Sequence, residues 1–231
     1  MKIKNSKTVW LVMVLMVVVM SSWRVSPALA DDAAKAQAII DRAKVTFEIF
    51  MQDKEYVWMH ENLNRVKGLL IYPQVLKGGF ILGGTGGTGV LVVKDAKTGD
   101  WSQPAFYTLG SVTFGLQIGG EASEIIVMVM TQKGIDSLYA SSIKLGGDVS
   151  IAIGPVGSGA KSDILADFIS FARSEGLYAG LNLEGSVLKV RDSLNHAYYK
   201  TEVSPVQIIL ERKVSNKNSD ILRETLKKAI Q

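Results

Sequence analysis

The stretch Lys67–Val90 reads KGLLIYPQVLKGGFILGGTGGTGV, and it decides which fold the chain can form. Glycine recurs there at positions where a strand would carry side chains. Glycine inside a strand lowers stability, so it persists mainly at a bulge, a barrel-type bend or a close approach of two backbones. A second run, FARSEGLYAGLNLEGS at Phe171–Ser186, repeats this texture. The two runs favour a strongly bent or barrel-like sheet.

Short apolar runs flank these glycines with the length and turn spacing of antiparallel strands. In Val112–Ile118 apolar and polar residues alternate with the period of a strand. Ile125–Met130 does not alternate, which suits a strand covered on both faces. Gly185 interrupts the last run, as a β-bulge would. The candidate strands are Leu69–Tyr72, Gly79–Gly84, Val90–Lys94, Ala105–Leu109, Val112–Ile118, Ile125–Met130, Val149–Ile153, Phe168–Ala172 and Leu177–Val190.

Helices are expected near both ends of the chain. The first covers residues 32–52, with Asp31 or Asp32 as its cap. Its apolar stripe consists of Ala36, Ile40, Ala43, Phe47 and Phe50. Ser204-Pro205-Val206-Gln207 has the residues of a capped helix start. Other helical segments are 54–66, 133–140 and 219–230. The fold class is therefore α+β, a bent and mainly antiparallel sheet with helices at the N- and C-terminal ends.

The first 30 residues have the layout of a secretory signal peptide. Three lysines precede the 12-residue apolar run Val9–Met20, and Ala28-Leu29-Ala30 follows as a cleavage pattern. That run is shorter than the ~20 residues that span a bilayer as a helix. We expect cleavage after Ala30, export to the periplasm with peripheral contact to the envelope membranes, and one domain over residues 31–231. Retention as an uncleaved anchor is the alternative.

Charge gives no support for a nucleic-acid partner. The net charge of +4 comes from 26 basic and 22 acidic residues, and the first 30 residues hold four of the basic ones and no acid. The rest of the chain is balanced at 22 and 22, so it lacks a long-range basic field. The chain has no cysteine, which excludes disulfides, thiolate metal sites and the lipid attachment of a bacterial lipoprotein.

No residue pattern indicates an active site or a cofactor. Gly84–Gly89 fits the letters G-x-G-x-x-G, but the strand-like Val90–Val93 follows where a dinucleotide site needs a helix. His60 and His196 are the only histidines, and neither stands in a metal-ligand spacing. A nucleophile elbow and a P-loop lysine are also missing. We therefore predict a protein that is not an enzyme and that binds no nucleotide, metal or cofactor.

Seven short motifs occur in order over roughly Ala38–Leu210. They are KGLLIYP (67–73), VLKGGF (75–80), the glycine-rich 83–89, WSQPAFY (101–107), GLQIGG (115–120), GPVG (154–157) and GLYAGLNLEGS (176–186). In this order and spacing the chain resembles the SYLF-domain family of lipid-binding modules. Members of that family are described as binding phosphoinositides and other anionic lipids. Eukaryotic members couple this to actin and membrane remodelling, and exported bacterial members resemble stand-alone versions.

The resemblance implies an exported, non-enzymatic module that binds an anionic phospholipid or a membrane surface. The candidate lipid contacts are Lys67, Lys77, Lys161 and Arg173. Glu175 and Ser158 stand where relatives often carry a cation, which argues against a phosphoinositide-specific pocket. Binding is then expected to depend more on apolar contact than on headgroup charge.

Two alternatives stay open at this stage. The apolar stripe of residues 32–51 either packs on the chain's own sheet, the default for an amphipathic helix, or enters a membrane. The alternative function is a structural or partner-binding cell-envelope protein with only incidental lipid contact, and no protein partner is indicated. If Gly83, Gly86 and Gly180 lie in tight bends or close strand contacts, replacing Gly180 by valine should unfold the domain.

Overall fold

The computed structural model describes residues 27–79, 82–114, 119–157, 164–174 and 182–230. The α-helices are α2 (Pro27–Gln52), α3 (Val57–Asn62), α4 (Gln132–Ser137), α5 (Asp192–Tyr199) and α6 (Asp220–Lys228). Short 3-10 turns are η1 (Lys54–Tyr56), η2 (Leu63–Arg65) and η4 (Lys217–Ser219), and η3 (Val206–Leu210) is a π-helical turn. The strands are β1 (Gly68–Gly79), β2 (Leu82–Val93), β3 (Ala105–Phe114), β4 (Gly119–Val129), β5 (Ser142–Lys144), β6 (Ile151–Ile153), β7 (Phe168–Ser174) and β8 (Val187–Val190).

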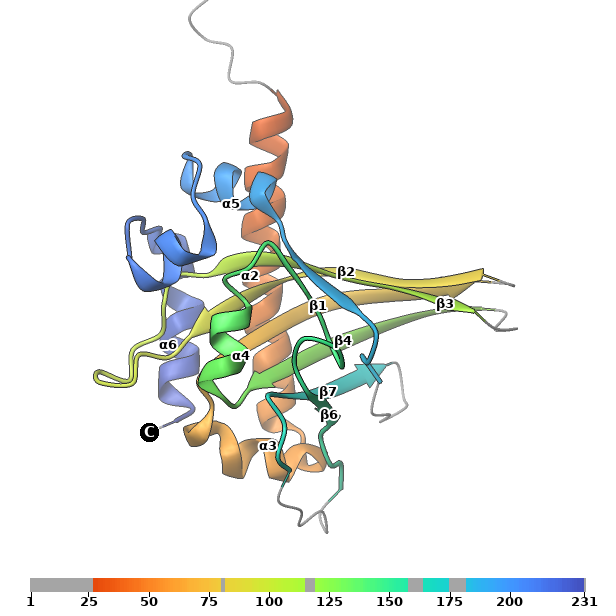
Figure 1. The fold of residues 1–231 in the computed structure, drawn as a ribbon. Helices are drawn as coiled ribbons and strands as arrows, with labels where there is room; N and C mark the ends of the chain where they lie inside the picture. The colour runs from red at the N-terminus through yellow and green to blue at the C-terminus, as the bar shows by residue number, and fades with distance from the viewer. Residues whose placement is uncertain (1–26, 80–81, 115–118, 158–163, 175–181, 231) are drawn as a thin grey trace, which may run out of the picture.

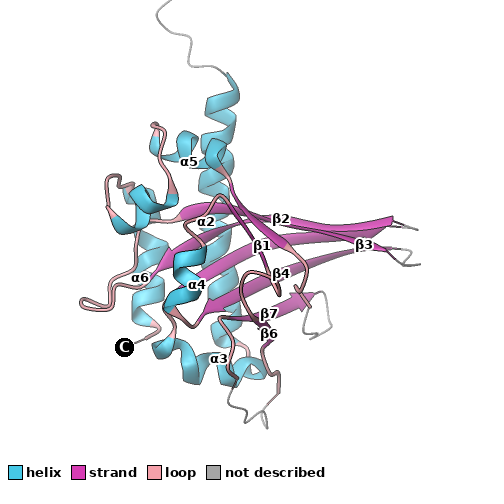
Figure 2. Cartoon of the chain, in the orientation of Figure 1, coloured by secondary structure: helices cyan, strands magenta, loops and turns pink. Residues whose placement is uncertain are grey.

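All eight strands form one curved sheet in the order β5-β8-β3-β2-β1-β4-β7-β6 (Figures 1 and 2). Every neighbouring pair is antiparallel except β6 and β7, which are parallel. The long strands β1 to β4 occupy the centre, and their far ends extend beyond the helices. This arrangement confirms the predicted α+β class and the mainly antiparallel, bent sheet.

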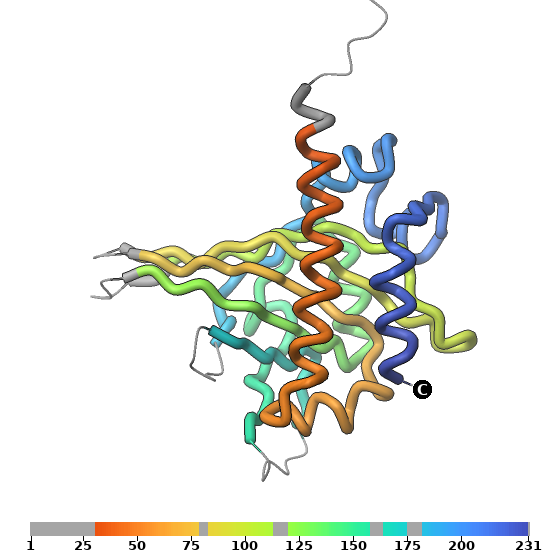
Figure 3. The backbone as a smooth tube through the Cα atoms, turned by 180° about the vertical axis from the view of Figure 1, so that it is seen from behind, coloured from red at the N-terminus to blue at the C-terminus, as the bar shows by residue number. Residues whose placement is uncertain are grey.

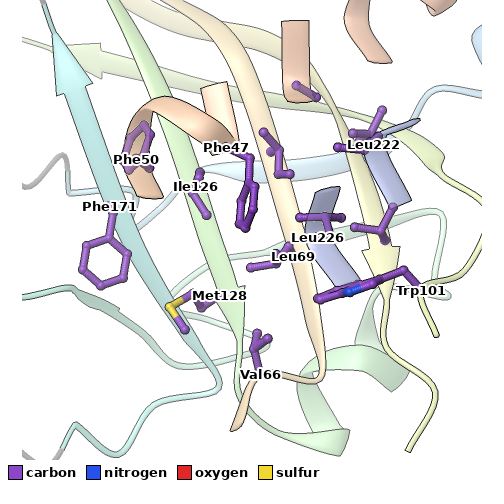
Figure 4. Close-up of a cluster of buried hydrophobic side chains, with 14 of the residues drawn as sticks. Phe47, Phe50, Val66, Leu69, Trp101, Ile126, Met128, Phe171, Leu222 and Leu226 are labelled. Carbon is purple, nitrogen blue, oxygen red and sulfur yellow. The ribbon is translucent and has the colours of Figure 1, made fainter. Parts of the chain in front are cut away.

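Helix α2 crosses one face of the sheet, with α6 beside it (Figure 3). The stripe predicted from helical spacing is fully buried: Ala36, Ile40, Ala43, Phe47 and Phe50 are at most 1% exposed. It packs on side chains from β1, β4 and β7 that point to the same face, among them Leu69, Ile126 and Phe171 (Figure 4). Of the two alternatives, the stripe therefore packs on the chain's own sheet.

The opposite face of the central strands is covered as well. Leu70, Tyr72, Ile125 and Val127 pack there against α4, β5 and the η3 turn. Successive residues of Ile125–Val129 therefore enter two different cores, which confirms that this strand is covered on both faces. Tertiary burial of both faces accounts for its unbroken apolar sequence.

Strand β1 contains a bulge at Pro73-Gln74. Its pairing with β2 shifts between Ile71 and Val75, and its pairing with β4 shifts at the same place. Proline lacks a backbone N–H and is tolerated in a sheet mainly at such irregular positions. Across the bulge, a β-carbon on Gly87 would overlap the carbonyl oxygen of Gln74. The glycines of this segment thus allow two backbones to approach closely.

Several sequence predictions change in detail. The glycine-rich segments were predicted to form several short strands. In the structure they form the continuous strands β1, β2 and β3, because backbone pairing continues through the glycines. The end of the last predicted strand does pair as β8, but Gly185 has φ +82° and lies in a turn before it. Gly86 does not meet the condition of a close strand contact: a β-carbon there would lie 3.7 Å from the nearest atom, the Leu109 oxygen. Gly180 lies outside the described residues.

The helical predictions hold with two corrections. Asp31 and Asp32 lie inside α2 and do not cap it, since the helix begins at Pro27. Helix α5, which holds His196, was not among the predicted helices. At Ser204 the capping box is formed: the Gln207 N–H donates to Ser204 Oγ (3.3 Å), and the Ser204 N–H donates to Gln207 Oε1 (2.9 Å). Within the described ranges, no helix has the length and apolarity to cross a membrane.

Candidate functional site

Two of the candidate lipid contacts, Lys67 and Lys77, lie at opposite ends of one strand. Lys67 immediately precedes β1, while Lys77 lies near its other end. At ~3.3 Å per residue the two are roughly 30 Å apart along the strand, too far to share a headgroup. Lys161, like Ser158 and Glu175, lies outside the described residues. Lys67 and Lys77 therefore stand as two separate candidate contacts.

Arg173 is held in an ion pair inside the fold. Its guanidinium lies 3.1 Å from Glu124 on the neighbouring strand. The other carboxylate oxygen of Glu124 accepts a hydrogen bond from Thr46 of α2 at 2.8 Å. Since Thr46 is buried, this chain of contacts joins α2 to the sheet. Arg173 is thus engaged in positioning the helix, and its charge is partly neutralised.

Lys77 lies at the edge of an open hollow of about 590 Å³ at the far end of the sheet. Glu121 is its register partner on β4. The hollow is lined by Leu76, Lys77, Gly78, Gly120, Glu121, Ala122 and Ser174. A single lysine beside a glutamate gives this end of the sheet little net charge.

At the same end of the sheet, one face is apolar. It is the face on which α2 packs closer to the middle of the strands. We call it the distal apolar surface, and its residues are Leu76, Gly78, Gly84, Gly86, Gly110, Val112, Gly120, Ala122 and Val187. Leu76 is 55% exposed and Val112 is 72% exposed. Figure 3 shows the strands continuing past α2, and none of the described helices lies over them there. Because most of its positions are glycine, few side chains project from this surface.

A second, strongly basic cavity lies at the opposite end, beside Lys67. It measures about 410 Å³ and is lined by four cationic side chains, Arg65, Lys67, Lys94 and Arg212, and by one acid, Asp95. We call it the basal cavity. Lys67 and Lys94 are adjacent because the Lys94 N–H donates to the Lys67 carbonyl at 2.8 Å. Of these four cations, the sequence analysis had selected only Lys67.

Residues of the sequence motifs also build the scaffold. Trp101 is buried in the core beneath α6, and Arg223 of that helix donates to its carbonyl at 2.9 Å. Gly154 lies over the Phe171 ring, which a β-carbon would overlap. His60 lies 2.8 Å, through Nε2, from the carbonyl oxygen of Phe50 near the end of α2. Packing thus accounts for the motif residues Trp101 and Gly154.

Asp167 is the acidic side chain with the densest set of polar contacts. It accepts hydrogen bonds from the Thr131 hydroxyl (2.6 Å) and from the Ser150 N–H (3.0 Å) and hydroxyl (2.9 Å). Burial alone would raise its pKa, but these hydrogen bonds and the nearby Lys133 lower the pKa to about 2. The three donors come from segments around α4 and β6, so Asp167 fastens these segments together. In the described part of the chain, no three potential ligands gather as a metal site would require.

The described part of the chain is an α+β domain built on one curved, mainly antiparallel sheet. Residues 110–229 match the model of the Ysc84 family, described as "Las17-binding protein actin regulator". The chain therefore belongs to this family, which is the SYLF family that its motifs resemble. The family resemblance inferred from the sequence motifs is confirmed.

Curated relatives extend the match beyond those residues. LAS seventeen-binding protein 3 of Saccharomyces cerevisiae is 30% identical over 192 residues, 80% of this chain and 41% of that protein. An SH3 domain-containing protein of Schizosaccharomyces pombe is 34% identical over 154 residues, 64% of this chain and 35% of its own. The human SH3 domain-containing YSC84-like protein 1 is 29% identical over 150 residues, 63% and 43% respectively.

The chain thus spans less than half the length of these relatives. Their names describe binding and regulation and do not name a catalytic activity. This agrees, at a coarse level, with the prediction of a non-enzymatic protein.

Proposed function

We propose that the chain is an exported, non-enzymatic module that binds a phospholipid membrane through the distal apolar surface. The observation that carries this proposal is the exposure of Leu76 and Val112 on a part of the sheet that none of the described helices covers. Full burial of a leucine or valine side chain contributes roughly 1.5–3 kcal/mol. Contact with the acyl region of a membrane supplies such burial.

The shape of the surface supports lipid as the partner. Its glycines leave few projecting side chains, so fluid acyl chains can cover the surface without a partner of fixed shape. The charges near it are few: Lys77 has Glu121 as its register partner, and Arg173 is paired with Glu124. An anionic phospholipid is therefore preferred only modestly, in keeping with a charge-balanced chain.

The test is vesicle co-sedimentation of the protein with Leu76→Asp and Val112→Asp variants. Each places a charge on the distal apolar surface, so vesicle binding should fall at least about tenfold for the double variant. Ile221→Asp is the matched control, because Ile221 is 54% exposed on α6, away from this surface. Equal vesicle binding by the double variant and the control would reject the distal surface as the membrane contact.

Export is part of the same proposal and rests on the pattern of the first 30 residues. Cleavage after Ala30 would leave Asp31 as the first residue, within the α2 helix. N-terminal sequencing of the protein recovered from a periplasmic fraction decides this. Recovery of intact Met1 in an inner-membrane fraction would contradict export.

A protein partner is the second candidate, because relatives are named for binding Las17. The distal apolar surface would then cover a partner's apolar side chains. Mass spectrometry of organic extracts from natively purified protein separates the two. Phospholipid recovered with the wild type and lost from the Leu76→Asp, Val112→Asp variant supports membrane binding, whereas its absence from both favours a protein partner.

A further inference from the structure

The basal cavity concentrates positive charge that the fold neutralises only in part. Its four cations face a single carboxylate, Asp95. That carboxylate is already occupied: it accepts from Arg212 at 2.5 Å and from the N–H groups of Lys97 and Thr98 at 2.8 and 2.9 Å. Asp95 therefore has little capacity left for Lys67 or Lys94.

The ammonium groups of Lys67 and Lys94, at the centre of the cavity, have no acidic partner among the described residues. Among the described residues, the Lys67 ammonium has no hydrogen-bond acceptor or ion-pair partner. The Lys94 ammonium donates to the neutral carbonyl of Asn64 at 2.5 Å. Burial, and then the positive charge of Lys67, lower the pKa of Lys94. Two partly buried ammonium groups side by side repel each other, and a bound anion would relieve this repulsion.

The rest of the cavity wall is apolar. Ile135 and Tyr139 line it from the α4 segment, and Ile209 and Leu210 line it from η3. Leu210 is 65% exposed, so an apolar group that enters the cavity would bury its surface. The cavity thus joins a cationic centre to a hydrophobic wall.

From this juxtaposition we propose that the basal cavity binds the phosphate group of an organic phosphate. Lys67 and Lys94 hold the phosphate oxygens, Arg65 and Arg212 stand at the rim, and the organic part lies against Tyr139 and Leu210. Phosphate fits better than a single carboxylate because it offers up to two negative charges to several cations.

This site is independent of the membrane contact proposed above. It lies at the other end of strands β1 and β2, roughly 30–40 Å from the hairpin end by strand rise. A flat membrane that touches the distal apolar surface would not reach it. The phosphate comes either from a soluble organic phosphate or from a lipid headgroup presented separately, and the experiment distinguishes these sources.

Isothermal titration of the mature protein with phenyl phosphate, inorganic phosphate and phenol tests the chemistry. Phenyl phosphate should bind at least about tenfold more tightly than inorganic phosphate, since only it uses the apolar wall, and phenol should not bind measurably. Lys67→Gln should weaken phenyl phosphate binding about tenfold, the loss of one charge-assisted contact. Lys97→Gln is the matched control, because Lys97 is exposed nearby and does not line the cavity.

Leu210→Ser should reduce the preference for phenyl phosphate over inorganic phosphate while leaving inorganic phosphate binding unchanged. Circular dichroism of each variant confirms that it is folded. Absence of phosphate binding in the wild type, or unchanged binding in a folded Lys67→Gln, Lys94→Gln double variant, would overturn the proposal.

A competition arm identifies the source of the phosphate. If anionic vesicles displace phenyl phosphate from the Leu76→Asp, Val112→Asp variant, the ligand is a lipid headgroup. If phenyl phosphate stays bound, the ligand is a soluble organic phosphate. Because Lys67→Gln and Leu76→Asp act at different ends of the sheet, failure of one proposal leaves the other measurable.

Discussion

A β-carbon on Gly89 would overlap the carbonyl oxygen of Ile71 on the neighbouring strand. The overlap arises because the bulge at Pro73-Gln74 brings β1 close to β2 just beyond Ile71. The letters of a dinucleotide fingerprint in Gly84–Gly89 thus serve strand packing, and the segment continues as a strand into Val93.

Gly89→Ala should destabilise the protein by about 1–3 kcal/mol, because the added methyl group forces a backbone shift in a packed sheet. For a domain of this size, each kcal/mol lowers Tm by about 2–4 °C. Gly86→Ala is the control, since its β-carbon would meet only an ordinary contact at 3.7 Å. A thermal melt in which both variants match the wild type would disprove the close-approach role of Gly89.

Acid should weaken the fold through Asp167. Its pKa falls from the ordinary 3.8 to about 2 in the folded protein, so its stabilising contribution is complete above ~4 and is lost as the pH falls toward 2. Asp167→Asn should lower Tm at neutral pH and flatten the decline of Tm between pH ~4 and ~2. Thermal melts across this range measure the effect.

Asp136→Asn provides the comparison for Asp167, because Asp136 is exposed on α4 and accepts only from the exposed Gln132 side chain. It should retain the acid-dependent decline of the wild type. A decline in Asp167→Asn that is as steep as in the wild type would place the acid sensitivity elsewhere.

Ser204→Ala should cost about 1 kcal/mol of stability, the usual effect of removing an N-cap. The change leaves the Gln207 N–H without its side-chain acceptor at the start of the segment that holds Ile208 and Ile209 in the core. Ser215→Ala serves as the control, since Ser215 is exposed. Urea midpoints report the difference, and equal midpoints for the two variants would mean that the cap is unimportant.

Vesicle binding should depend weakly on salt. Attraction between exposed charges is screened beyond ~8–10 Å at physiological ionic strength, whereas burial of apolar surface persists. Lys77→Gln should therefore reduce binding to anionic vesicles by less than about threefold. Co-sedimentation at low and moderate salt measures both effects. A steep loss of wild-type binding with salt would show that headgroup charge dominates.

Local patterns in the sequence determined much of the fold in advance. The buried stripe of α2, the doubly covered Ile125–Val129 and the cap at Ser204 depend on spacing between near neighbours, which the sequence displays directly. Helix α5 was missed because its residues DSLNHAYY combine polar and aromatic side chains without a clear period. Only its packing against α2 fixes it as a helix.

The candidate contacts were harder to group, because side-chain neighbours depend on strand pairing. Lys67 precedes β1 and Lys94 follows β2, so the pairing of Gly68 with Val93 places the two lysines together. Arg212 reaches the same cavity from the C-terminal segment, and no local signal in the sequence indicates this position.

The bulge at Pro73-Gln74 also reverses which side chains of β1 face each side of the sheet. Before it, the odd-numbered Leu69 and Ile71 face α2, whereas after it the even-numbered Leu76 does. With strict alternation along β1, Leu76 would face the side of the sheet opposite α2, and Lys77 would face the α2 side. The one extra residue in the bulge therefore determines which side chains of β1 lie on the distal apolar surface. Deleting Gln74 would replace the apolar Leu76 on that surface by the charged Lys77.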